Sequence, residues 1–197
     1  IINTSNPLQG ERVAGTVGFA LPGQQVRVAS EDGVVVPAGE VGMIEVAGPN
    51  VFQGYWRMPE KTAEEVRPDG FFITGDLGVQ AADGRLSIVG RSKDLVISGG
   101  YNVYPKEVEV ALDEMPQVAA SAVIGVPHPD FGEAVVAVVV PAGDEVTQAD
   151  VDAALGDQLA RFKQPKRVLN VAELPRNTMG KVQKNLLRDQ HGDLFAS

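Results

Sequence analysis

The segment FITGDL, residues 72–77, places Asp76 at the end of an apolar run and directly after Thr74 and Gly75. A carboxylate offers two oxygens, which can accept hydrogen bonds from two adjacent hydroxyls such as those of a ribose. Gly-Asp pairs are also common in ordinary turns. The motif alone is therefore compatible with a nucleotide site or with a purely structural turn.

The block GRSKDLVISGGYNVYPKEVE, residues 90–109, is more specific. It combines Arg91, a charged linker, a short apolar strand, a Gly-Gly turn and a proline at a plausible first helical position, Pro105. The simplest interpretation is a hairpin followed by a helix, with the glycines serving backbone geometry. Glycines also let a ligand chain pass close to the backbone, so both interpretations can hold together.

A third segment, PRNTMGKVQK at residues 175–184, places Lys181 after Gly180 in a polar loop that we expect to be mobile. A lysine is a compact charge on a flexible stem, suited to oxygens that gain negative charge in a transition state. The segment is not a Walker phosphate loop, because Pro175 stands where that motif needs glycine and Val182 where it needs Ser or Thr. In isolation such a lysine is usually an ordinary surface residue.

The elements that must position these residues follow from the periodicity. Up to Gly90, short β-branched runs at residues 25–29, 42–47 and 86–89 alternate with the turn dipeptides Asp32-Gly33, Asp69-Gly70 and Asp83-Gly84. This half is predicted to be rich in β-structure. We find no internal repeat and no low-complexity segment.

Beyond Arg91 the period changes to that of helices. Apolar residues at helical spacing predict one helix from Pro105, and a second after Thr147, with an apolar face extending through Leu159 and Phe162. Two apolar runs between them, residues 119–126 and 134–140, are predicted to be strands buried on both faces. The boundary between the two halves falls in the charged stretch at residues 91–94.

Composition and charge exclude several classes of protein. The chain has 197 residues, no cysteine, two histidines (His128 and His191) and a net charge of −9. These counts exclude disulfides and a cysteine nucleophile, argue against a multi-histidine metal site, and disfavour general binding to nucleic acid. No apolar run approaches the length of a membrane span. Eight basic residues against one acidic residue, Glu173, between positions 161 and 188 form either a solvated face or a surface that attracts polyphosphate.

Five ordered blocks resemble the adenylate-forming acyl-CoA synthetases, a family that also includes luciferases and the adenylation domains of peptide synthetases. These blocks span nearly the whole chain and are GYWRMPEKT (54–62), FITGDL (72–77), residues 90–109, VIGVPHPDFGE (123–133) and PRNTMGKVQK (175–184). Within the family, SGGYNVYPKEVE together with PRNTMGKVQKNLLR looks most like the bacterial malonyl-CoA synthetases.

The resemblance implies roles at individual positions. Asp76 and Arg91 match residues that hold the ribose hydroxyls of ATP and AMP, and Lys93 matches the hinge about which a small domain rotates. Lys181 matches the catalytic lysine of the first half-reaction, in which ATP and an acid give acyl-AMP and pyrophosphate. Its implied role is electrostatic stabilisation.

In the second half-reaction, rotation would bring the turn at residues 98–101 to the site, where the thiol of CoA attacks the adenylate. The residues assigned to CoA are Ser98, Gly99, Gly100, Tyr101, Lys163 and Lys166.

The resemblance also implies an α+β fold in two parts. Residues 1–92 would be a β-rich subdomain, part of a distorted barrel in the large domain, and residues 93–197 a small mobile α/β domain. The chain starts at Ile1 and lacks the family's phosphate loop, the motif that holds adenine and magnesium, and most of the acyl pocket. We therefore expect a C-terminal portion of a longer enzyme, inactive alone, with no metal ligands of its own and with Mg²⁺ held mostly by upstream residues.

The expected whole protein is a cytoplasmic malonate or methylmalonate CoA ligase, which binds neither nucleic acid nor membrane. A ligase for medium-chain or aryl acids is an alternative within the enzymes, and a binding or regulatory module that kept the fold is a non-catalytic one. The joint presence of Asp76, Arg91 and Lys181 argues against a pure scaffold. Lys181 also matches a regulatory acetylation target of the family, which implies a protein lysine acetyltransferase as a partner.

Overall fold

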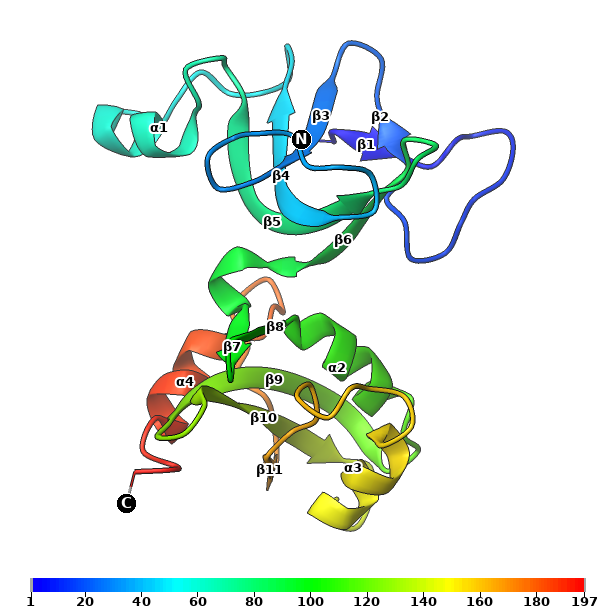
Figure 1. Ribbon diagram of the computed structural model, residues 1–197, viewed down its shortest axis with the longest axis vertical. Helices are drawn as coiled ribbons and strands as arrows, with labels where there is room; N and C mark the ends of the chain where they lie inside the picture. The colour runs from blue at the N-terminus through cyan, green and yellow to red at the C-terminus, as the bar shows by residue number, and fades with distance from the viewer. Residues whose placement is uncertain (1, 197) are drawn as a thin grey trace. The chain divides into compact units, whose positions relative to one another are not determined.

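The structure is a computed structural model that describes residues 2–196, and its fold is mixed α/β and rich in β-sheet. The chain folds into two compact units, one ending at Lys93 and the other beginning at Asp94. The first and last residues, which the two expected domains include, lie outside the described part of the chain. Figure 1 labels the helices and strands of both units.

The first unit is built on an antiparallel sheet of four strands in the order β3-β4-β5-β6. Its elements are β1 (Thr4–Ser5), β2 (Phe19–Ala20), β3 (Gln25–Ala29), β4 (Val41–Ala47), α1 (Pro59–Glu65), β5 (Phe72–Gln80) and β6 (Leu86–Arg91). The predicted strands at 25–29, 42–47 and 86–89 are confirmed, as are the three turns, in which Gly33, Gly70 and Gly84 adopt φ between 80° and 89°.

The expected distorted barrel is not closed within residues 2–196. β3 and β6 remain the two edges of the open sheet, and β1 and β2 form a separate two-stranded ribbon. Closure of a barrel requires each strand to pair on both sides. The described part of this unit therefore forms an open sheet.

A buried charge lies inside the first unit. Glu45 on β4 is completely buried. Its Oε2 lies 2.7 Å from Arg27 Nη2, and its Oε1 lies 2.9 Å from Arg67 Nη2. Arg27 also pairs with Asp69 at 2.7 Å and lies over the ring of Phe71. This network joins β3 and β4 to the turn that precedes β5.

The second unit has a sheet in the order β11-β10-β7-β8, with β9 also paired to β10. Its elements after the 3₁₀ turn η1 (Ser92–Asp94) are β7 (Val96–Ser98), β8 (Tyr101–Val103), α2 (Pro105–Asp113), β9 (Val118–His128), β10 (Gly132–Pro141), α3 (Gln148–Leu155), β11 (Arg167–Asn170) and α4 (Lys184–His191). The predicted hairpin and the two long buried strands are confirmed.

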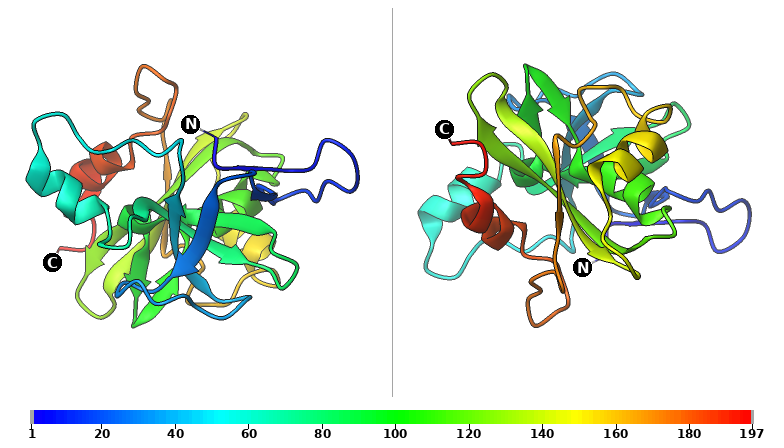
Figure 2. Two further views of the ribbon diagram at one scale, coloured as in Figure 1. Left: turned by 90° about the horizontal axis from the view of Figure 1, so that it is seen from above. Right: turned by 90° about the horizontal axis from the view of Figure 1, so that it is seen from below.

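β9 and β10 are covered on both faces. Val123, Val135 and Val139 pack toward α2 and α3, whereas Ile124 and Val138 lie in a second core with Leu174 and Leu187, on the side of α4. Figure 2 shows α4 on one side of the sheet and α2 with α3 on the other. Burial on both faces explains why these strands read as continuous apolar runs.

The helix after Thr147 is shorter than predicted. Thr147 and Asp150 form a complete capping box, but α3 ends at Leu155, before Leu159 and Phe162. Gly156 follows as the C-cap, and glycine weakens helix continuation. Leu159 and Phe162 nevertheless pack against the core of this unit. Their apolar spacing therefore predicted correctly that they are packed in the core, but not how long the helix is.

Within residues 2–196, no helix is long and apolar enough to cross a membrane.

Candidate functional site

Asp76 and Arg91 face each other on neighbouring strands. They are direct partners in the register of β5 and β6, and Arg91 Nη1 lies 3.1 Å from Asp76 Oδ1. The Asp76 side chain is 29% exposed and the Arg91 side chain 49% exposed. The structure therefore brings together the two residues that the sequence predicts for a nucleotide, and leaves both accessible to one.

Asp76 stands at the end of a bulge in β5. Between the pairs Glu45–Ile73 and Met43–Leu77, β4 contributes one residue and β5 contributes three, Thr74, Gly75 and Asp76. Bulges re-aim side chains and are frequent beside functional sites. In this strand the bulge presents the Asp76 carboxylate opposite Arg91.

Thr74 and Gly75 make the bulge possible. The Thr74 hydroxyl donates to the Ile44 carbonyl at 2.8 Å and accepts from the Asp76 N–H at 3.1 Å, so it replaces ladder bonds that the bulge removes. Gly75 has φ +74°, a backbone conformation that would be strained for a residue with a side chain. Ser92 donates to the Gly75 carbonyl at 3.2 Å. Thr74 and Gly75 therefore stabilise the bulge that positions Asp76.

Lys93, the predicted hinge, lies in η1 and is exposed. It is the last residue of the first unit, and Asp94 is the first residue of the second. Asp94 is held inside its own unit by Arg188, with an N–O distance of 3.1 Å. Free rotation near Lys93 would therefore leave this anchor intact.

The Gly-Gly turn joins β7 to β8 with two residues in the loop. Gly99 and Gly100 have φ of +57° and +83°, the signature of a tight hairpin turn whose twist matches that of the strands. The Gly99 N–H donates to the Phe131 carbonyl at 2.9 Å. Ser98 is only 4% exposed, so it would offer a ligand little beyond its backbone, whereas Tyr101 is 59% exposed.

An aromatic and basic cluster surrounds this turn. Tyr101 stacks on Phe162 with ring centroids 4.6 Å apart, and the Lys166 ammonium lies 5.6 Å from the centroid of Phe131. Lys163 is engaged by both oxygens of Glu107, at 2.6 and 2.8 Å. Of the two lysines assigned to CoA, Lys166 is the freer to receive a phosphate.

Lys181 lies in a hairpin between β11 and α4, seen projecting from the sheet as the orange loop of Figure 2. Its side chain is exposed and forms no ion pair with the described residues. The loop is more ordered than its polar sequence suggested, since the Asn177 N–H donates to the Lys181 carbonyl at 2.9 Å and Arg176 bridges Val182. The catalytic lysine predicted from the sequence is therefore carried on a structured turn.

The basic surface of residues 161–188 is partly neutralised. Lys163, Lys184 and Arg188 pair with Glu107, Glu109 and Asp94 respectively. These acids precede the basic stretch in the sequence, so counting charges along that stretch could not reveal the pairing. The remaining basic residues, including Lys166 and Lys181, are those available to an anion.

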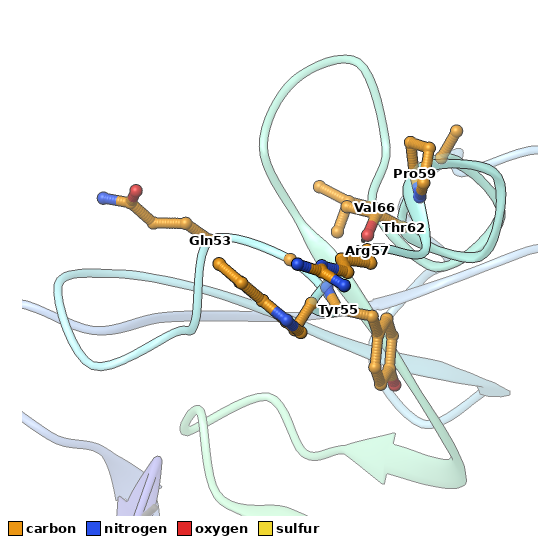
Figure 3. A pocket seen from close by; sticks show the side chains of 9 residues that line it. Gln53, Tyr55, Arg57, Pro59, Thr62 and Val66 are labelled. Atoms are coloured by element: carbon orange, nitrogen blue, oxygen red, sulfur yellow. Dashed lines mark hydrogen bonds between the residues drawn. The ribbon is translucent and has the colours of Figure 1, made fainter.

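A separate hollow lies in the first unit, over the GYWRMPEKT block (Figure 3). It has a volume of about 510 Å³ and is lined by residues that include Tyr55, Arg57, Thr62 and Val66. The Tyr55 hydroxyl donates to Glu65, and this bond raises the pKa of the tyrosine. None of the residues predicted for ATP or CoA lines this hollow.

Within residues 2–196, no three His, Asp or Glu side chains are grouped so that they could hold a metal ion.

Two family descriptions match the chain. The AMP-binding enzyme family matches residues 1–56, and the AMP-binding enzyme C-terminal domain matches residues 107–181. The chain therefore belongs to the adenylate-forming AMP-binding enzymes, and the family resemblance inferred from the sequence is confirmed.

The relatives include named CoA ligases. The indoleacetate–CoA ligase of Aromatoleum aromaticum is 43% identical over 183 residues, covering 92% of this chain and 36% of the ligase. The feruloyl-CoA synthase of an Amycolatopsis species is 46% identical over 179 residues, covering 90% of this chain and 36% of the synthase.

A solved structure agrees with the finer resemblance. ATP-bound MatB from Rhodopseudomonas palustris, a malonyl-CoA synthetase, is 60% identical with a TM-score of 0.93, over 98% of this chain and 39% of MatB. The chain thus spans between 36% and 39% of the length of these three proteins.

The sequence did not single out Phe131, Phe162 or Asn177 as members of the site. The periodicity predicts Phe162 on a helix, and no sequence pattern indicates its contact with Tyr101. Asn177 could have been recognised from the sequence, because an asparagine side chain in a turn often hydrogen-bonds the backbone two residues further on.

Proposed function

We propose that the full-length protein containing this chain is an AMP-forming acid:CoA ligase. The acid carboxylate attacks the α-phosphorus of ATP, giving acyl-AMP and pyrophosphate; the thiol of CoA then attacks the acyl carbon, giving acyl-CoA and AMP. The observation that carries the proposal is the cross-strand Asp76–Arg91 pair at the bulge, set in a chain of the AMP-binding family. Residues up to 92 would belong to the large domain and residues from 93 to the mobile domain.

The pair fits the ribose of ATP. Asp76 offers acceptor oxygens to adjacent hydroxyls, and its contact with Arg91 orients the carboxylate. Both side chains are part-exposed, so a nucleotide can approach without unfolding the strand. Magnesium would arrive with the phosphates of ATP, with its protein ligands mostly outside the described residues.

Lys181 is proposed to act in the first half-reaction only. Its ammonium would stabilise the negative charge that develops between the carboxylate and the α-phosphate, a role that needs positioning rather than proton transfer. Movement about Lys93 would then exchange Lys181 for the turn at Gly99 and Gly100. In the second half-reaction this turn would let the pantetheine arm pass close to the backbone.

The aromatic and basic cluster suits the nucleotide end of CoA. Tyr101, which is exposed and stacks on Phe162, offers an aromatic surface to an adenine, and Lys166 provides a positive charge for a phosphate. Lys163 would contribute only if it leaves Glu107.

The proposed acid is malonate or methylmalonate, because MatB shares 60% identity with this chain. The relatives named for indoleacetate and ferulate support the alternative of an aryl acid. We further propose that the enzyme is cytoplasmic, which is consistent with the absence of cysteine. We also propose that a lysine acetyltransferase modifies Lys181, whose side chain is exposed.

The test is acid-dependent exchange between ATP and labelled pyrophosphate by the full-length protein, with malonate, methylmalonate, a medium-chain acid, indoleacetate and ferulate in parallel. Exchange with malonate or methylmalonate well above the others supports the full proposal, and preference for an aryl or medium-chain acid overturns the proposed acid alone. Exchange with none of the acids overturns the ligase. The 197-residue chain alone should show no exchange, since it supplies only part of the site.

A further inference from the structure

The loop that carries Lys181 is a hydrogen-bonded hairpin. The Gln183 N–H donates to the Pro175 carbonyl at 2.8 Å, and the Gly180 N–H closes the turn on the Asn177 carbonyl at 2.9 Å. Gly180 has φ +78°, the conformation that such a turn requires. The loop therefore has a defined backbone before any ligand binds.

Asn177 is the residue around which this hairpin is organised. Its Oδ1 accepts from the N–H groups of Met179 and Lys181, each at 3.0 Å, while its own N–H donates to the Lys181 carbonyl at 2.9 Å. Asn177 thus bonds both backbone groups of Lys181. Met179 is 73% exposed, so little else packs against the tip.

The base of the hairpin is anchored to the core. Leu174 and Leu187, which flank it, are 6% and 1% exposed. Lys184, at the start of α4, lies 2.5 Å from the nearly buried Glu109 of α2, and the same Glu109 oxygen accepts the Val123 N–H at 2.9 Å. The base is therefore fixed to α2 and β9 by a pair with little exposure to water.

We propose that Asn177 is a positioning residue for Lys181, which makes residues 175–183 a preformed arm that enters and leaves the site without rearranging. This proposal rests on the proposed role of Lys181 in acyl-adenylate formation. A lysine on a fixed backbone loses less conformational entropy when it reaches the transition state than one on a loose loop. The Asn177 side chain uses only its acceptor oxygen, so other acceptors of similar reach should replace it in part.

The experiment compares Asn177→Ala, Asn177→Asp and Asn177→Ser in the full-length protein. Acyl-adenylate formation is followed by pyrophosphate exchange, and the second half-reaction by transfer of a chemically prepared acyl-adenylate to CoA. Asn177→Ala should lower kcat for adenylation by about 10-fold to 100-fold, with KM for ATP within about twofold, because misplacement by about 1 Å is costly. Transfer to CoA should stay within about twofold of the parent.

Graded rescue distinguishes positioning from general damage. Asn177→Asp keeps the acceptor at the same reach and should recover most of the adenylation rate; Asn177→Ser, a weaker turn former, should recover less. Asn185→Ala, at an exposed asparagine of α4, is the matched control and should change neither half-reaction. Equal loss of both half-reactions in Asn177→Ala, or no recovery in Asn177→Asp, would overturn the proposal.

Lys181→Met separates this proposal from the proposed function. Loss of adenylation in Lys181→Met with normal adenylation in Asn177→Ala overturns the positioning role alone. Normal adenylation in Lys181→Met overturns the catalytic role of Lys181, and the positioning role with it.

Discussion

Asp76 and Arg91 are direct partners across β5 and β6, with Arg91 Nη1 3.1 Å from Asp76 Oδ1, at the point where β5 bulges away from β4. The pair depends on three local features: the Thr74 hydroxyl, the positive φ of Gly75 and the strand register. It gives the carboxylate a fixed direction while leaving part of it exposed.

Asp76→Asn in the full-length protein should raise KM for ATP by about 10-fold or more and lower adenylation. Asparagine keeps the shape but loses the charge that strengthens bonds from ribose hydroxyls, a difference of about 1.5 kcal/mol or more. The measurement is pyrophosphate exchange against ATP concentration.

Asp83→Asn is the matched control, because Asp83 is an exposed acid of the β5–β6 turn that also pairs with an arginine, Arg85. It should leave KM for ATP within about twofold of the parent. An unchanged KM in Asp76→Asn would remove Asp76 from the nucleotide site.

Gly100→Ala should slow transfer to CoA more than adenylation. An added Cβ at Gly100 meets no atom within 4 Å, so the fold accommodates its volume; the positive φ of +83° costs about 1 kcal/mol, and the methyl narrows the path beside the turn. Transfer from prepared acyl-adenylate should fall by about 10-fold, whereas pyrophosphate exchange should change by less than about threefold.

Gly143→Ala controls for the added methyl alone, since Gly143 also has open space around it and no positive φ. It should leave both half-reactions unchanged. If Gly100→Ala reduces both half-reactions equally, the turn has no specific part in the CoA step.

The sequence predicted those elements whose cause is local. The β-branched runs of β3, β4 and β6, the Asp-Gly turns and the Gly-Gly hairpin all follow from conformational preferences of a few residues. Pro105 and the Thr147 capping box marked helix starts for the same reason.

Features that depend on partners distant in the sequence were missed. At the bulge of Thr74–Asp76, the Thr74 hydroxyl bonds the Ile44 carbonyl in place of a backbone N–H. No sequence pattern in β5 indicates this bond. β11 was not predicted, because four residues carry little periodicity without the parallel pairing to β10. The contact between Tyr101 and Phe162 arises only once the sheet and the segment after α3 have packed.

Glu45→Gln should destabilise the first unit. The substitution removes the negative charge between Arg27 and Arg67, whose side chains are only 17% and 22% exposed, and leaves two like charges close together. We expect a loss of up to about 3 kcal/mol, below the value for a fully buried pair because both arginines reach water. Hydrogen exchange of the β4 amides in the full-length protein measures it.

Glu40→Gln, at an exposed acid, should leave β4 protection unchanged. Equal protection in Glu45→Gln and the parent would mean that the buried network adds nothing to stability.

Thr147→Ala should destabilise α3 by about 1 kcal/mol, the usual value of an N-cap, and should weaken its dependence on pH. Hydrogen bonds from the Thr147 side chain and then from its backbone lower the pKa of Asp150. Because the folded pKa is depressed, the ionised Asp150 stabilises the fold at pH values above its unfolded pKa of about 3.9, and this stabilisation is lost as pH falls through the lower folded pKa. Hydrogen exchange in α3 should therefore differ most between parent and variant above pH 4, and the difference should narrow below it to the part due to the neutral bond between the Thr147 hydroxyl and the Asp150 N–H. The control is Thr178→Ala, at an exposed threonine in a turn that caps no helix. A difference in α3 that persists undiminished at the lowest pH would show that the Asp150 charge plays no part in the cap.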